Sequence, residues 1–382
     1  MRRGQAFWLA ATVFGATLLT GCGSTASVMP GEHQGDGMRA CDGTIAVMAS
    51  TGSAGATQPA AMNWARVRLD SFNAKHGSSF RIEPSDVYAE PELAGQEAKR
   101  LAADPSIVGV VGPATSIDTE AAGPVFDAAG LAYVTPSATN VELADGHLKL
   151  FFRIVGNNQR QAEVIVRLIA SRLDAKSILI VGDHEGYGLD LSKRIARGLK
   201  NDQLGFRRAS VELRQADYTD VVAQAGSSRG DVVVLALVEP DDAQRLVDQL
   251  HGAGKNPTIV GGDTLHNINE FHATGAYLAS PAPDVSLLED GAASLRLYDE
   301  IFGDLAPFAA LSDVAMEAVA TAAFSSCREG EATRKGVAGA LPDIRIDPSV
   351  IGSPVSFDAD HEVVGGRYWI YRIEGNHYRE VM

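Results

Sequence analysis

Two hydroxyl side chains follow apolar runs that are typical of strands, and both could hold an anion. Ser116 comes after the run Ile107 to Val111 and directly before a helical pattern. Its hydroxyl and the backbone amides of a helix N-terminus can together bind a carboxylate. Thr139 follows the run Leu131 to Val134 and a Pro-Ser-Ala turn, and offers a second hydroxyl and further amides. Structural alternatives stay open, since Ser116 could cap a helix and Thr139 could stabilise a turn.

One acidic side chain stands at a comparable place. Asp263 follows the short apolar run Thr258 to Val260. Loops at the carboxyl ends of parallel strands are where open α/β sheets bind ligands. An unpaired charge is very costly to bury, so a closed site for a zwitterion needs anion donors and one acid in place. Asp263 could also be a solvated turn acid, or the cap of a helix that begins near Leu265.

The elements that must position these residues alternate along the chain. Strand and helix patterns follow one another from Thr44 to Val134, and the alternation restarts at Leu150 and continues to Val260. Such alternation implies parallel sheets with helices on both faces. The predicted fold class is α/β, with two doubly wound parallel-sheet lobes.

The last part of the chain breaks this alternation. Three helices are predicted without strands between them, and three short strands follow: helices Leu288 to Phe302, Ala310 to Cys327 and Glu331 to Ala340, then strands Pro354 to Phe357, Tyr368 to Ile373 and His377 to Val381. Helices without a sheet of their own must pack on one already made. We therefore expect the helices to return to the first lobe and the strands to the second, across a multi-strand hinge. The expected lobes are residues 43–155 plus 283–345 and residues 156–282 plus 346–382.

The N-terminus has the pattern of a targeting segment. Arg2 and Arg3 precede an apolar stretch from Ala6 to Leu19, which ends in Thr-Gly-Cys22. This resembles the bacterial lipoprotein lipobox. It implies a signal peptide over residues 1–21, lipidation of Cys22, a linker over residues 22–42, and a protein anchored to the membrane outside the cytoplasm. The alternatives are a plain signal peptide or an uncleaved anchor, with Cys22 incidental.

Composition excludes some classes of function. The chain has 382 residues, enough for two domains, with 33 Lys plus Arg against 48 Asp plus Glu and a net charge of −15. Nucleic-acid binders concentrate positive charge, so we expect no nucleic-acid partner. Beyond the N-terminal segment, we expect no stretch of the roughly 18 apolar residues that span a bilayer.

Two cysteines remain once Cys22 is assigned to lipid. Cys41 and Cys327 could form one disulfide in an oxidising compartment, or could stay unpaired as small apolar residues. There is no C-x-x-C pair, and the spacing of His266, Glu270 and His272 fits no zinc motif. We expect exposed loop histidines there, with no metal and no cofactor.

An ordered set of motifs resembles the type I periplasmic binding proteins, in particular the leucine/isoleucine/valine-binding branch. The set spans roughly residues 43–382 and comprises Gly109-Val-Val-Gly-Pro-Ala-Thr-Ser116, Leu131-Ala-Tyr-Val-Thr-Pro-Ser-Ala-Thr-Asn-Val-Glu-Leu143, Phe152-Arg153, Asp183 with Tyr187-Gly188, Gly261-Gly-Asp263 and Phe357-Asp-Ala-Asp.

The resemblance implies a role for five residues. Ser116, Ala138 and Thr139 would contact the α-carboxylate and α-ammonium of an amino acid, Asp263 would pair with the ammonium, and Tyr187 would pack on the ligand, although it could equally pack in a core. The implied function is a solute-binding lipoprotein of an ABC importer, which takes an amino acid of branched-chain type or a related small polar solute. The implied partners are permease subunits and the membrane. We expect a monomer.

Two departures from the family pattern put a branched aliphatic ligand in question. Where the leucine-type proteins carry aromatic residues, this chain has a small polar run, Thr51 to Gln58, and the pair Val238-Glu239. Glu239 would suit a cationic ligand group if it faced the cleft, but it could equally begin a helix.

Other functions find less support. The run Gly226-Ser-Ser228-Arg-Gly230 has the letters of a nucleophile elbow, but that motif needs a strand before it and a helix after it, the reverse of the pattern here. We therefore expect a protein that is not an enzyme. A lipoprotein of the same fold that signals to a receptor or kinase, without transport, stays open as the alternative.

Overall fold

The computed structural model describes residues 40–49, 59–184, 186–228, 230–285, 288, 292–302 and 307–382. All of them belong to one compact unit, Arg39–Met382. The predicted signal peptide, the lipidation site Cys22 and the loop Thr51 to Gln58 lie outside the described residues.

The first lobe is built on a five-stranded parallel sheet with the order β2-β1-β3-β4-β5. Its strands are β1 (Asp42–Met48), β2 (Ser79–Ser85), β3 (Ile107–Val111), β4 (Tyr133–Thr135) and β5 (Phe151–Arg153). Alternate side chains of β1 enter different cores, because successive residues of a strand point to opposite faces. Ile45 and Val47 belong to one apolar cluster, and Ala46 and Met48 to the other.

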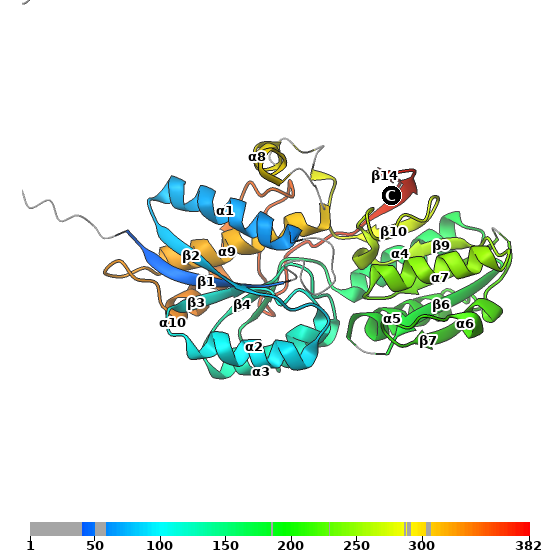
Figure 1. Ribbon diagram of the computed structural model, residues 1–382, viewed down its shortest axis with the longest axis horizontal. Coiled ribbons are helices and arrows are strands. Elements are labelled where there is room, and N and C mark those ends of the chain that lie inside the picture. Colours follow the sequence, from blue (N-terminus) through cyan, green and yellow to red (C-terminus); the bar gives the residue numbers. More distant parts are fainter. Residues whose placement is uncertain are drawn as a thin grey trace, which may run out of the picture. The chain divides into compact units, whose positions relative to one another are not determined.

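Helices cover both faces of this sheet, as Figure 1 shows. The helices of the lobe are α1 (Ala60–His76), α2 (Pro91–Ala103), α3 (Ser116–Ala128), α8 (Ala292–Phe302), α9 (Leu311–Ser325) and α10 (Arg334–Ala340). Side chains of α1, α9 and α10 pack with Ile45 and Val47, whereas those of α2 and α3 pack with Ala46 and Met48. Side chains of the late helices α9 and α10 thus pack on the sheet of the first lobe.

The second lobe contains a seven-stranded sheet with the order β14-β13-β10-β9-β8-β6-β7. Its elements are α4 (Asn158–Arg172), β6 (Ser177–Asp183), α5 (Gly186–Asn201), β7 (Arg207–Val211), α6 (Thr219–Gln224), β8 (Asp231–Ala236), α7 (Pro240–Gly252), β9 (Thr258–Gly261), β10 (Tyr277–Ser280), β13 (Trp369–Glu374) and β14 (His377–Glu380). Strands β6 to β10 are parallel, and β13 and β14 add an antiparallel edge. Strand β10 was not among the predicted strands.

The two faces of this sheet carry different helices. Ile178 and Ile180 of β6 pack with α4 and α5, and Leu179 and Val181 pack with α6 and α7. Alternate side chains of one strand thus pack against helices on opposite faces of the sheet, as expected in a doubly wound lobe.

One segment lies elsewhere than the sequence predicts. The short strands β11 (Arg345–Ile346) and β12 (Val355–Ser356) pair with each other, not with the second-lobe sheet. The apolar side chains of Ile346, Phe357 and Val363 belong to the core of the first lobe. We propose that the lobe boundary falls after Val363. The apolar side chains of this segment are buried in the first-lobe core, and this burial outweighs the strand pattern that predicted pairing with the second-lobe sheet. The remaining short elements are the 3-10 helices η1 (Val141–Ala144), η2 (Asp263–Leu265), η4 (Pro307–Ala310) and η5 (Leu341–Asp343).

A disulfide joins Cys41 to Cys327, with a Cα–Cα distance of 6.0 Å and a sequence separation of 286. It links the start of β1 to the chain just after α9, so both ends lie in the first lobe.

One described segment, Phe308–Ser325, is long and apolar enough to cross a membrane by length and composition, which the sequence analysis did not expect. Most of it is α9. Val314 and Val319 of this helix are fully buried, and they pack with the first-lobe sheet. The apolar character of the segment is that of a core helix.

Candidate functional site

The loops at the carboxyl ends of the strands in the two lobes converge on one region. In the first lobe, β3 continues into α3 through Gly112 and Pro113. Gly112 has φ +107°, and a Cβ there would lie 2.2 Å from the carbonyl oxygen of Met48 at the end of β1. Only glycine allows this close approach of the two strand ends. In the second lobe, β6 continues into α5, which begins next to Tyr187.

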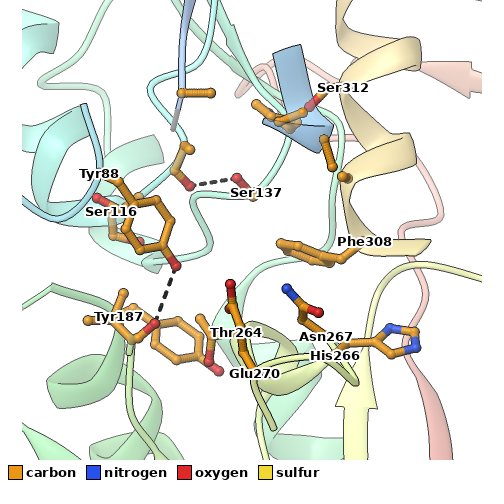
Figure 2. Close-up of a pocket in the computed structure, with 18 residues that line it drawn as sticks. Tyr88, Ser116, Ser137, Tyr187, Thr264, His266, Asn267, Glu270, Phe308 and Ser312 are labelled. Atoms are coloured by element: carbon orange, nitrogen blue, oxygen red, sulfur yellow. Dashed lines mark hydrogen bonds between the residues drawn. The ribbon is translucent and has the colours of Figure 1, made fainter. Parts of the chain in front are cut away.

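A cavity of about 140 Å³ lies between these loops, and Figure 2 shows it in close-up. Both lobes line it, with residues that follow β1, β2, β3, β4, β6, β8 and β9 and with the segment before α9. The lining residues are Ala49, Ala60, Ala61, Tyr88, Ala114, Thr115, Ser116, Pro136, Ser137, Tyr187, Val238, Thr264, His266, Asn267, Glu270, Phe308, Ala309 and Ser312.

The first-lobe wall presents hydroxyl groups and the start of a helix. Thr115 is the N-cap of α3, since its Oγ1 accepts from the amide of Asp118. Ser116 is the first residue of α3, and its Oγ accepts from the Asn140 amide at 3.1 Å, so its own proton can point at a ligand. The Ser137 hydroxyl donates to the Ala114 carbonyl at 2.5 Å, which ties the loops after β3 and β4 together.

The second-lobe wall combines aromatic, amide and acidic groups. The ring of Tyr187 lines the cavity, and Figure 2 places Glu270 and Asn267 beside Phe308 at the same opening. Glu270 is half-buried. Among the described lining residues it is the one with a carboxylate, and none carries a Lys or Arg side chain. The charged side chain that the described lining contributes is therefore an acid.

Asp263 lies behind Tyr187 and does not line the cavity. Its side chain accepts from the hydroxyl of Tyr368 at 3.4 Å and from the amide of Thr264 at 3.0 Å, and it lies close to the hydroxyl of Tyr187. A Cβ on Gly262 would lie 1.8 Å from the Tyr187 hydroxyl, so a glycine is needed where that hydroxyl passes. Burial raises the pKa of Asp263 to about 6, although the bonds from Tyr187 and its neighbours act in the opposite direction.

Ala138 and Thr139 also lie outside the cavity lining. The Ala138 amide donates to the Thr135 hydroxyl at 2.9 Å, and the Thr139 carbonyl accepts from the amide of Asn158 at 2.8 Å. The Oγ1 of Thr139 is buried and makes no hydrogen bond among the described residues. Neither residue lines the cavity, and the ligand contacts that the resemblance implies for them stay predictions.

A buried arginine binds the backbone of this turn. Arg153, at the end of β5, is fully buried and donates to the carbonyls of Ala138 at 3.0 Å and Asn140 at 2.7 Å. Its guanidinium also makes a two-point ion pair with Glu362. The carbonyls of the loop after β4 are thus held by the Arg153 guanidinium, whose charge Glu362 compensates.

Glu239 does not face the cavity. Its carboxylate accepts from Arg214 at 2.8 Å. Glu239 is therefore not placed to bind a cationic group of a ligand in this cavity. The neighbouring Val238 does line the cavity, where it contributes an aliphatic surface. The prediction of an exposed histidine at position 266 is wrong, because His266 is buried, its Nδ1 lies 2.8 Å from the Ser280 hydroxyl, and burial lowers its pKa to about 3.

The described residues contain no group of three or more His, Cys, Asp or Glu side chains that could hold a metal ion. The described part of the Gly226–Gly230 run lies between α6 and β8, and the hydroxyl of Ser228 donates to Asp231. The strand-then-helix context of a nucleophile elbow is therefore not present there.

A second cavity of about 290 Å³ adjoins the first on the other side of Ser116 and Tyr187. Asp183 lines it, together with His184 and Glu212, whose side chains lie 3.2 Å apart. The buried Asp183 accepts from the amide of Val238 at 2.9 Å, and burial raises its pKa to about 7.

Comparison with known proteins gives the family. Residues 45–377 match the family model described as periplasmic binding protein. The chain belongs to the type I periplasmic binding proteins. It is 28% identical over 349 residues to the Leu/Ile/Val-binding protein BraC3 of Rhizobium johnstonii, a match that covers 87% of this chain and 92% of that protein. A Leu/Ile/Val-binding protein of Escherichia coli is 25% identical over 209 residues, which is 53% of this chain and 56% of that protein.

Solved structures show the same fold. The branched-chain amino acid transporter substrate binding protein LivJ from Streptococcus pneumoniae, in complex with isoleucine, matches with a TM-score of 0.77 at 23% identity, over 88% of this chain and 99% of that one. A solute binding protein of an ABC transporter from R. palustris, in complex with benzoate, matches with a TM-score of 0.74 at 14% identity, over 88% and 95%. The predictions of family and fold are confirmed. A solute-binding role outside the cytoplasm follows from the family.

Sequence reasoning missed part of the site. Tyr88, Ser137, Glu270, Phe308 and Ser312 line the cavity, but none was a candidate ligand residue. Ser137 could have been found, since it lies in the same strand-end loop as Thr139. Phe308 and Ser312 could not, because they reach the cavity only through the return of the chain to the first lobe.

Proposed function

We propose that this protein binds an amino acid or a closely related small zwitterion in the cavity between its lobes. The observation that carries the proposal is the opposite character of the two walls. The first lobe offers the Ser116 hydroxyl at the N-terminus of α3, and the second lobe offers the Glu270 carboxylate and the Tyr187 ring.

In the proposed complex, the ligand carboxylate lies at Ser116, where a hydroxyl donor and the partial positive charge of the helix N-terminus act together. The ligand ammonium faces Glu270 and the ring of Tyr187, since an aromatic face attracts a cation. The ligand side chain contacts apolar groups, and Ala61, Val238 and Phe308 provide them. Asp263 adds negative potential from behind Tyr187.

Binding would proceed by closure of the lobes about the chain crossings between them. Closure removes water from the polar groups, and charge-assisted hydrogen bonds then contribute about 1.5–3 kcal/mol each. The cavity is small, which favours a compact ligand such as a branched-chain amino acid. Relatives described as Leu/Ile/Val-binding proteins support this ligand class.

We further propose that the protein is a lipoprotein attached through Cys22, that it works as a monomer, and that its loaded form delivers the solute to the permease of an ABC importer. The N-terminal pattern and the ABC transporter proteins among its structural relatives support this placement. Mass spectrometry of the membrane-extracted protein, with a Cys22→Ser control, tests the lipid.

Calorimetry with three matched compounds tests the ligand class. Leucine carries both charged groups, 4-methylpentanoate lacks the ammonium, and isoamylamine lacks the carboxylate. We expect leucine to bind at least tenfold more tightly than either analogue, because each loses one charge-assisted contact worth about 1.4 kcal/mol or more. A wider panel of amino acids and benzoate then ranks the side chain.

Equal affinity for leucine and 4-methylpentanoate would show that the acidic wall does not recognise an ammonium, and the zwitterion proposal would fail. Tight binding in this assay combined with normal growth of a permease deletion strain on the ligand as sole nitrogen source would favour the sensor alternative.

A further inference from the structure

Helices α4 and α5 of the second lobe carry a charge opposite to that of the protein. The chain has a net charge of −15. The two helices contain seven basic residues, namely Arg160, Arg167, Arg172, Lys193, Arg194, Arg197 and Lys200. They contain two acidic residues, Glu163 and Asp190.

The basic side chains share one surface. Lys193, Arg197 and Lys200 are exposed and recur at the spacing that places them on one side of α5. Arg160 and Arg167 are exposed two turns apart on α4. We call the surface formed by these five residues the α4–α5 basic face.

The two helices that form this face pack closely. A Cβ on Gly198 of α5 would lie 2.8 Å from the side chain of Val166 on α4, so the missing side chain lets the helices approach. Arg167 and Arg197 line the groove between them. Asp190 is already paired with Arg194 at 2.8 Å, which leaves Glu163 as the exposed acid of the two helices.

The opposite face of the same sheet shows that this is not a general property of the lobe. Helix α7 carries Asp241, Asp242 and Asp248 against Arg245, and α6 carries Asp220. The basic side chains of α4 and α5 and the acidic side chains of α6 and α7 therefore lie on opposite sides of one sheet.

We propose that the α4–α5 basic face rests on an anionic phospholipid surface and orients the tethered protein. A body with a net negative charge is repelled by such a surface except through a basic face, so the separation of charge selects one orientation. The physiological reach of this proposal rests on the proposed anchor at Cys22, since a tether of about 20 residues raises the local concentration of the face at the bilayer.

A lipid surface suits the face better than a protein partner. Protein interfaces centre on buried apolar or aromatic anchors. The exposed large hydrophobic residues in the described part of the chain are Leu297, Ile301, Phe324 and Val364, and none belongs to α4 or α5. Flexible, exposed cations without an apolar centre match mobile phosphate groups.

The test measures co-sedimentation of the compact unit Arg39–Met382, which carries no lipid, with vesicles. We expect binding to vesicles of phosphatidylglycerol and phosphatidylethanolamine at about 50 mM salt, loss of binding at about 500 mM salt, and no binding to phosphatidylcholine. Reversal of two charges, Arg167→Glu with Arg197→Glu, should lower the partition at least tenfold, because one basic residue near such a surface contributes about fivefold.

The matched control reverses two exposed charges of the first lobe, Arg81→Glu with Lys335→Glu, and should reduce the partition less than threefold. Equal losses in the two variants, or equal binding to phosphatidylcholine, would overturn the proposal. Unchanged vesicle binding of the α4–α5 variant, with loss of cross-linking to a membrane protein in cells, would assign the face to a protein and also overturn it. Unmodified Cys22 in the mass spectrum would refute the anchor and leave the vesicle result standing.

Discussion

The two lobes contribute unlike walls to one cavity. The first lobe is built on a wholly parallel sheet and contains the Cys41–Cys327 disulfide, and its cavity wall presents hydroxyls beside a loop whose carbonyls Arg153 binds. The second-lobe wall presents the Tyr187 ring and acidic groups at two depths, Glu270 at the cavity and Asp263 behind it. Under the proposed function, a wall of hydroxyl donors in one lobe and an acidic wall in the other would together impose one orientation on a bound zwitterion.

The largest expected effect is a loss of stability when Arg153, which binds the loop of the first-lobe wall, is replaced. Arg153→Ala should lower the free energy of unfolding by about 3–5 kcal/mol, because it leaves Glu362 and two loop carbonyls without their buried partner. Urea unfolding measures this change. Arg345→Ala, which breaks an exposed pair with Asp347, is the control and should cost less than about 0.5 kcal/mol. Similar losses in both variants would mean that Arg153 does not fix the wall.

The covalent tie should stabilise one lobe only. Replacement of Cys41 and Cys327 by serine should lower the free energy of unfolding by about 2–4 kcal/mol. Hydrogen exchange should rise in β1 and α9 before it rises in β6 and β8, since the disulfide lies within the first lobe. Wild-type protein in reducing buffer is the matched comparison, and no shift in either sample would contradict the expectation.

The acidic wall can be probed at the cavity itself. Glu270→Gln should weaken leucine binding about 10–30-fold, which is about 1.4–2 kcal/mol, because the ammonium loses its nearest counter-charge. Calorimetry with leucine measures the loss, and 4-methylpentanoate, which has no ammonium, should bind the variant and the wild type alike. A loss that is equal for both compounds would show that the substitution disturbs the cavity in another way.

The donor wall should respond to a different probe. Ser116→Ala removes one hydroxyl donor and should weaken leucine binding about 3–10-fold, or roughly 1 kcal/mol. Here isoamylamine, which lacks the carboxylate, should bind variant and wild type equally. Each substitution should thus leave the affinity for one analogue unchanged: 4-methylpentanoate for Glu270→Gln and isoamylamine for Ser116→Ala. If either substitution weakens binding of its own unaffected analogue, the assignment of the two walls is wrong.

The smallest expected effect is the pH dependence of leucine affinity that Asp263, behind Tyr187, should cause. The pKa of Asp263 is about 6 because the group is buried, so its charge is lost as the pH falls through 6. Leucine affinity should therefore be constant above pH 7 and about threefold weaker at pH 5. The pKa of His266 is about 3, so this residue stays neutral over that range.

Asp263→Asn provides the control for this pH dependence. Asp183, with a pKa of about 7, titrates in the same window, and only the variant separates the two acids. The pH dependence should disappear in Asp263→Asn. An unchanged dependence would assign it to Asp183 instead.

Part of this site was readable from the sequence and part was not. Ser116 was predicted because it lies in the loop after a strand, and the carboxyl ends of parallel strands must meet at one edge of a sheet. The role of Tyr187 was predicted only through the family resemblance. Asp263 was placed at the correct strand end, but strand position does not reveal depth, and the hydroxyl of Tyr187 covers it. Thr139 sits in the expected loop, where Arg153 and Asn158 bind the backbone carbonyls, but it does not line the cavity.

The sequence by itself determined the alternating elements, the family and the excess of acidic charge, since hydrophobic periodicity and composition are local properties of the chain. Only the tertiary structure decided that Glu270 and Phe308 face one cavity, that Cys41 meets Cys327, and that basic side chains of two helices form one face. Each of these joins residues far apart in sequence, and their meeting depends on how buried surfaces pack and on which way each side chain then points.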